Sequence, residues 1–150
     1  MQNITIETIK HYNPCKSGLN NALKYYPKFN GDIIDLLCLE NISYSDKIWV
    51  ACKIVDYKIL QKWAVLCAES QIENYNKIYP NDNRITNCIE TTKKYLMGEN
   101  FNLSTLSAAR SAESAAWSAA RSAARLAAWD QEILNIQLLI IAIQEYNDLL

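Results

Sequence analysis

The feature that most constrains the fold is that neither glycine nor proline occurs in the last 52 residues of the chain. Within this stretch, residues 107–128 contain eleven alanines and five serines among 22 positions. Alanine has the highest intrinsic helix propensity, and the two strongest helix breakers are missing. The units of this tract recur every three or four residues, which places equivalent positions on one slowly drifting stripe of a helix. We therefore predict a long alanine-rich C-terminal helix.

The rest of the chain carries repeated signals for the start and end of helices, and no sustained strand alternation. Capping residues predict short helices at 5–12, 18–26, 33–39 and from about residue 44, with N-caps at Thr5, Ser17, Asp32, and Ser43 or Ser45. Longer helices are expected at 56–79 and 85–97, separated by a turn at 80–83, and Asn30-Gly31 predicts a further turn. The predicted fold class is all-α.

The chain length suits a single domain, which we expect to be a multi-helix bundle over residues 1–150. Its expected parts are a region of short helices at 1–55, a helical hairpin at 56–98, and an alanine-rich helix followed by an aliphatic helix at 104–150. On the long helix of the hairpin, the spacing of apolar residues directs one set of side chains toward the core: Ile59, Leu60, Trp63, Leu66, Cys67 and Ile72.

Composition argues against several classes of function. The 15 basic residues are balanced by 16 acidic ones, which does not favour a nucleic-acid-binding domain. The five cysteines form no CxxC pair, and no secretory signal or membrane span is visible, so we expect mostly buried, reduced thiols in a cytoplasmic protein. His11 is the only histidine, and Pro14 separates it from Cys15, so neither a metal site nor a cofactor is predicted and an enzyme is not favoured.

One stripe of long side chains runs along the alanine-rich tract, formed by Arg110, Glu113, Trp117, Arg121, Arg125 and Trp129. Trp117 and Arg121 stand four residues apart, as do Arg125 and Trp129, so both pairs can form cation–π contacts. The stripe has three interpretations. The rings could bury in the core while the arginine heads reach solvent. The stripe could form a protein-binding face. Arg110, Arg121 and Arg125 could instead hold the phosphates of a nucleotide or another small ligand.

The aliphatic segment 133–143 carries apolar side chains around most of a helix circumference. Such a helix is buried or lies in an oligomer interface. We therefore expect a symmetric homodimer through the C-terminal third, with a monomeric bundle built around this helix as the alternative.

A set of residues from Trp63 onward resembles the signature of a helical family of candidate immunity proteins found in bacterial and phage genomes. The set comprises a tryptophan, a Cys-Ala-Glu triplet, a Tyr-Pro turn with an acid and an arginine, an Ile-Glu pair, a Gly-Glu helix end and an alanine-rich tract. In chain order its members are Trp63, Cys67, Ala68, Glu69, Tyr79, Pro80, Asp82, Arg84, Ile89, Glu90, Gly98, Glu99 and 107–129. The resemblance covers about half of the chain. It implies a protein that binds and neutralises another protein. Together with the stripe and the lack of assembled catalytic groups, it favours a non-enzymatic inhibitor of a bacterial toxin or defence component.

Two departures from the family pattern stand out. Ile85-Thr86 replaces a Pro-Arg pair, and the aliphatic segment 131–146 replaces one that bears histidine and threonine. Any activity carried by those histidines in relatives is absent from this chain. Within the signature, Trp63 and Cys67 read as core residues. Asp82 is expected to cap the helix at 85–97, and Arg84 to pair with Glu69 or Glu90 across two antiparallel helices.

A second resemblance lies near the N-terminus. A short helix is followed there by an N-x-C-x-x-G pattern and an aromatic-proline turn, an element found in phage and mobile-element proteins. Asn13, Cys15, Gly18, Tyr26 and Pro27 fit this element loosely.

Overall fold

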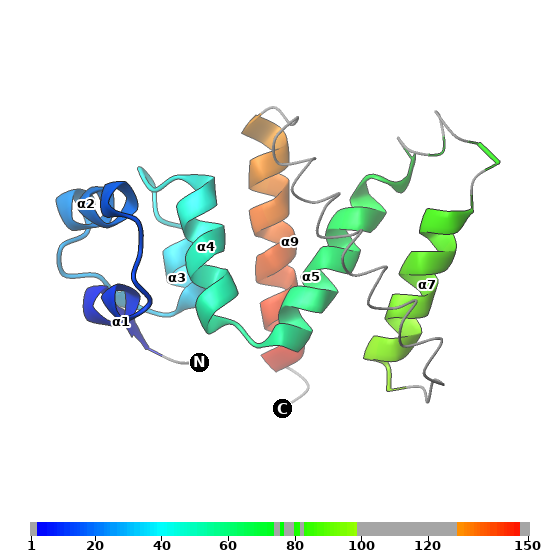
Figure 1. Cartoon of the computed structure of the whole chain (residues 1–150), viewed down its shortest axis with the longest axis horizontal. Helices are drawn as coiled ribbons and strands as arrows, with labels where there is room; N and C mark the ends of the chain where they lie inside the picture. Colours follow the sequence, from blue (N-terminus) through cyan, green and yellow to red (C-terminus); the bar gives the residue numbers. More distant parts are fainter. Residues whose placement is uncertain (1–2, 74–75, 77–79, 82, 99–128, 148–150) are drawn as a thin grey trace. The chain divides into compact units, whose positions relative to one another are not determined.

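The computed structural model describes residues 3–73, 76, 80–81, 83–98 and 129–147 (Figure 1). These residues form seven helices and one two-stranded sheet with strands of two residues, which confirms the predicted all-α class. The chain divides into two compact units, Met1–Asp56 and Tyr57–Leu150. The organisation of residues 1–150 as one domain stays a prediction. The alanine-rich helix predicted at 107–128 lies outside the described residues.

The N-terminal unit contains four helices: α1 (Ile6–His11), α2 (Lys16–Tyr25), α3 (Ile33–Leu37) and α4 (Tyr44–Ile54). Thr5 and Asp32 each close a capping box, and Ser43 caps α4 through the backbone N–H of Asp46, so these three predicted caps are confirmed. The predicted cap at Ser17 is wrong. Cys15 is the N-cap of α2, because its extended backbone lets its sulfur accept the N–H of Gly18 at 3.3 Å.

Asn30-Gly31 was expected to form a turn, and this prediction is wrong. The two residues form β2, which pairs antiparallel with β1 (Ile4–Thr5), Ile4 facing Gly31 and Thr5 facing Asn30. The pairing fully buries Ile4 and ties the start of the chain to the segment before α3. A turn signal read from two residues cannot reveal that a strand 26 positions away supplies the partner.

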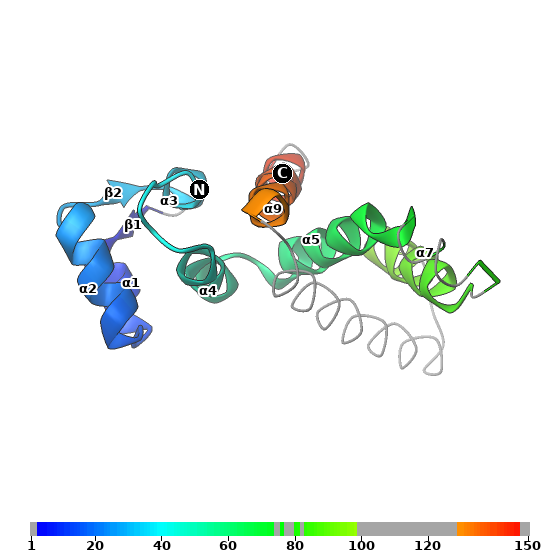
Figure 2. The same cartoon turned by 90° about the horizontal axis from the view of Figure 1, so that it is seen from above.

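The C-terminal unit contains α5 (Tyr57–Ser70), α7 (Arg84–Leu96) and α9 (Trp129–Asn147). Helix α5 packs against both α9 and α7 (Figure 1, Figure 2). Helix α5 ends at Ser70, short of the predicted continuation to residue 79, with a turn at Gln71. Gly98 follows α7 with a φ of 81°, the left-handed conformation that glycine favours just past a helix end.

The core of the C-terminal unit lies where α5 meets its neighbours. Ile59, Leu60, Trp63 and Cys67 are buried as predicted, whereas Leu66 and Ile72 are only half-buried. Helix α9 contributes Leu139, Ala142 and Ile143. Two isoleucines of the same helix remain partly exposed, Ile133 at 44% and Ile141 at 41%, so the helix is not buried on every side.

The expectation of mostly buried cysteines is wrong for the four that the structure describes. Cys15 and Cys38 are exposed, Cys52 is half-buried, and Cys67 alone of these four is buried; all four are free thiols.

Candidate functional site

Two residues of the family signature, Trp63 and Cys67 of α5, both contact Asn135 of α9. The indole Nε1–H of Trp63 donates to the backbone oxygen of Asn135 at 2.9 Å, and the Cys67 thiol donates to its Oδ1 at 3.6 Å. Trp63 and Cys67 stand one helical turn apart, so they present adjacent side chains to α9. The Asn135 residue is only 1% exposed. The tryptophan and the cysteine of the signature therefore join two helices.

Burial also determines the chemistry of Cys67. Desolvation raises the pKa of its thiol from 9.0 to about 12. A thiolate is the nucleophilic form of cysteine. Cys67 is therefore a neutral, buried thiol at physiological pH.

Two glutamates of the signature, Glu69 and Glu90, meet at Lys93, which the sequence did not single out. Lys93 of α7 forms an ion pair with Glu69 of α5, and its ammonium nitrogen lies 3.5 Å from Oε1 of Glu90 on its own helix. The hydrogen bond to Glu69 is the main cause that raises the pKa of Lys93. The spacing of Glu90 and Lys93 was a visible signal, but the contact with Glu69 required the packing of α5 on α7.

The other predicted site residues fall where the structure gives no side-chain description. Asp82 and the stripe residues Arg110, Glu113, Trp117, Arg121 and Arg125 lie outside the described ranges. Arg84 is the first residue of α7 and Trp129 the first of α9. The predicted cap at Asp82 is wrong, because the N-cap of α7 is Asn83, which makes no side-chain capping bond. The pairing of Arg84 with Glu69 or Glu90 stays a prediction.

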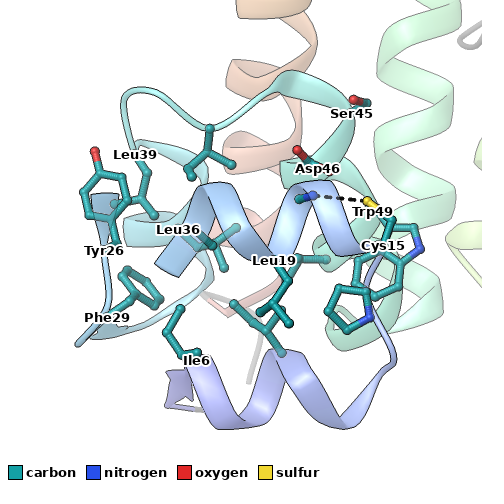
Figure 3. A pocket seen from close by; sticks show the side chains of 16 residues that line it. Ile6, Cys15, Leu19, Tyr26, Phe29, Leu36, Leu39, Ser45, Asp46 and Trp49 are labelled. Carbon is teal, nitrogen blue, oxygen red and sulfur yellow. Dashed lines mark hydrogen bonds between the residues drawn. The ribbon is translucent and has the colours of Figure 1, made fainter. Parts of the chain in front are cut away.

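A cavity of about 250 Å³ lies within the N-terminal unit, and the sequence analysis did not predict it (Figure 3). Its walls come from all four helices of the unit and from the loops between them, including Ile6 of α1, Leu19 of α2, Leu36 of α3 and Trp49 of α4. The thiol of Cys15 also lines it. Hydrogen bonds from the Ser17 side chain and from the Gly18 N–H lower the pKa of this exposed thiol.

Two further observations concern the residues that the structure describes. No helix among them is long and apolar enough to cross a membrane. Nor do they contain a group of three or more His, Cys, Asp or Glu side chains arranged to hold a metal ion.

Residues 51–129 match the family model described as "Imm-5 like putative immunity protein". The match covers more than half of the chain, and the protein belongs to this immunity-protein family. No curated protein and no solved structure gave a match. All residues that line the cavity of the N-terminal unit precede the matched segment.

Proposed function

We propose that this protein is a non-enzymatic immunity protein that binds and neutralises a bacterial toxin or defence component in the cytoplasm. Membership of the immunity-protein family carries this proposal. The expected reduced cysteines favour a cytoplasmic site of action.

The partner-binding residues that we propose are those of the stripe: Arg110, Glu113, Trp117, Arg121, Arg125 and Trp129. The described signature residues support this assignment indirectly. Trp63 and Cys67 are buried against Asn135, and Glu69 and Glu90 are occupied by Lys93. The stripe is a further set of large side chains within the family segment. Tryptophan and arginine are the residue types most enriched in interface hot spots.

The proposal is tested by protection from a toxin. The products of the two flanking genes are each expressed in bacteria, and growth that either product stops should resume when the immunity protein is expressed with it. Purified protein should inhibit the toxin in proportion to its amount, with complete inhibition at an equimolar ratio. Inhibition by a small catalytic fraction would indicate an enzyme and overturn the non-enzymatic assignment. Failure to protect against the product of either flanking gene would contradict the immunity function.

Substitutions then test the stripe. Trp117→Ala and Arg121→Ala should each weaken toxin binding by about 30-fold, the effect expected for a hot-spot residue. Lys94→Ala is the matched control, because Lys94 is an exposed cation on α7 outside the stripe. Affinities are measured by calorimetry after circular dichroism has shown that the variants are folded. Unchanged affinity in both stripe variants would remove the stripe from the interface. A nucleotide that co-purifies with the wild type and is lost in Arg121→Ala would favour the phosphate-binding alternative.

A further inference from the structure

The cavity of the N-terminal unit is lined almost entirely by apolar side chains. Ile6 and Ile9 of α1, Leu19 and Ala22 of α2, and Trp49 of α4 are among them. At about 250 Å³ it is larger than an engineered apolar cavity of about 150 Å³ that holds benzene. It is smaller than pockets for drug-sized ligands, which begin near about 300 Å³. A body of one aromatic ring with a short substituent therefore matches its size.

Three polar side chains of the lining lie toward one end. Figure 3 shows Ser45, Asp46 and Cys15 toward one end of the cavity, with Tyr26 and Phe29 at the other. A ligand that fills this space must be apolar over most of its length and polar at one end. The carboxylate of Asp46 is the charged group at that end.

Gly18 explains why the polar groups converge. A Cβ atom at position 18 would lie 2.7 Å from Oδ1 of Asp46 and 3.2 Å from the sulfur of Cys15. The absence of a side chain at position 18 leaves room for both groups beside α2. The other carboxylate oxygen of Asp46, Oδ2, accepts the hydroxyl of Ser43 at 2.7 Å, which orients the group.

The charge of Asp46 is not matched by a basic side chain in the described part of the chain. The ion pairs recorded there involve Lys10, Lys62 and Lys93, none of which contacts Asp46. An ammonium group would supply the missing positive charge and form a charge-assisted hydrogen bond, which is stronger than a neutral one. A carboxylate ligand would be repelled at the same position.

We propose that this cavity binds a small amine with an aromatic or branched apolar body, with the body in the apolar chamber and the ammonium group at Asp46. Three residues of the N-x-C-x-x-G and aromatic-proline element, Cys15, Gly18 and Tyr26, line this cavity. These three residues of the element therefore form part of the wall of the proposed ligand site. The cavity lies outside the immunity-family segment, so this inference does not rest on the proposed function.

Four probes of similar size test the chemistry of the head group: phenethylamine, phenethyl alcohol, propylbenzene and phenylacetate. Binding to the full-length protein is followed by NMR shifts of the backbone amides of Gly18 and Trp49. Phenethylamine should bind with a Kd of about 1 mM, the range expected for a ligand of this size. The alcohol and the hydrocarbon should bind more weakly, and phenylacetate weakest of all. Equal binding of the amine and the acid, or no binding of any probe at about 10 mM, would overturn the proposal.

Two substitutions locate the ligand. Asp46→Asn keeps a side-chain oxygen but removes the charge, and it should weaken phenethylamine binding by about tenfold while leaving propylbenzene almost unchanged. Ala22→Leu should fill the chamber and abolish binding of both probes. Asn20→Leu on the exposed side of α2 is the control and should bind as the wild type does. An unchanged preference for the amine in Asp46→Asn would refute the role of the carboxylate.

Thiol footprinting gives a second measurement that does not depend on a substitution. Iodoacetamide should alkylate exposed Cys15 several-fold more slowly when phenethylamine saturates the cavity, because the sulfur lines the site. Cys38 is the internal control, since it is exposed but not part of the lining, and its rate should not change. Equal slowing of both cysteines, or of neither, would place the ligand elsewhere.

Discussion

The buried thiol of Cys67 should make the stability of this protein sensitive to alkaline pH. In the folded chain its pKa is about 12, against 9.0 for an ordinary thiol. Between these two values the folded state keeps a proton that the unfolded state releases, so the stabilisation is complete below about pH 9 and is lost as the pH rises toward about 12. A pH of about 10.5 lies about 1.5 units above the pKa of the thiol in the unfolded state. Ionisation of that thiol stabilises the unfolded state and lowers the free energy of unfolding by about 2 kcal/mol.

The assay is urea unfolding at about pH 7.5 and about pH 10.5, followed by circular dichroism and tryptophan fluorescence. Three proteins are compared: the wild type, Cys67→Ala, and Cys38→Ala as a variant that loses an exposed thiol. Tyrosine and lysine titrations are common to all three and cancel in the comparison. The wild type and Cys38→Ala should lose about 2 kcal/mol more stability at the higher pH than Cys67→Ala does.

The result that contradicts this reasoning is an equal alkaline loss in all three proteins. It would mean that solvent reaches the Cys67 thiol and its contact with Asn135 of α9. Labelling with a thiol reagent is a second measurement. In the folded wild type at about pH 8, Cys15 and Cys38 should react and Cys67 should remain unmodified.

Three further predictions concern stability and assembly. In a urea titration, Lys93→Met should lower the free energy of unfolding by about 1 kcal/mol, because Glu69 and Glu90 lose the lysine with which both pair. The control Lys94→Met should change it by less than about 0.5 kcal/mol. Asp32→Ala removes the acceptor of two backbone N–H groups at the start of α3, and thermal melts should show that the free energy of unfolding falls by about 1 kcal/mol. An unchanged melting temperature would mean that water satisfies these N–H groups equally well. Sedimentation at micromolar concentration should give a dimer, as the apolar segment 133–143 predicts, and a single 17.1 kDa species would instead make that helix the centre of a monomer.

Local chemistry allowed much of the N-terminal unit to be predicted. Thr5, Asp32 and Ser43 cap helices through bonds that reach no more than three residues along the chain, so the capping residue and its partner are visible together. Local sequence did not identify Cys15, whose sulfur caps α2 in place of the predicted hydroxyl of Ser17. Which residue caps depends on where the backbone turns from extended to helical, and that is decided by the packing of the neighbouring helices.

The candidate site shows the same division. Trp63 and Cys67 were expected in the core from their helical spacing, but their partner Asn135 lies about 70 residues further along the chain and is a polar residue in an aliphatic segment. Lys93 was not expected at all, since an ion pair between two helices depends on their relative rotation. The cavity could not be predicted because its sixteen lining residues are scattered from Ile6 to Val50.

The sequence by itself determined the helical class, most helix starts and the family, because propensity, capping and motif spacing are properties of neighbouring residues. Only the tertiary structure decided that Asn30-Gly31 is a strand, that Asn135 joins two signature residues, and that Cys15, Gly18 and Asp46 meet at one end of an apolar cavity. These arrangements require segments distant in sequence to come within a few ångströms. Their free energy depends on burial and close approach, which no local pattern encodes.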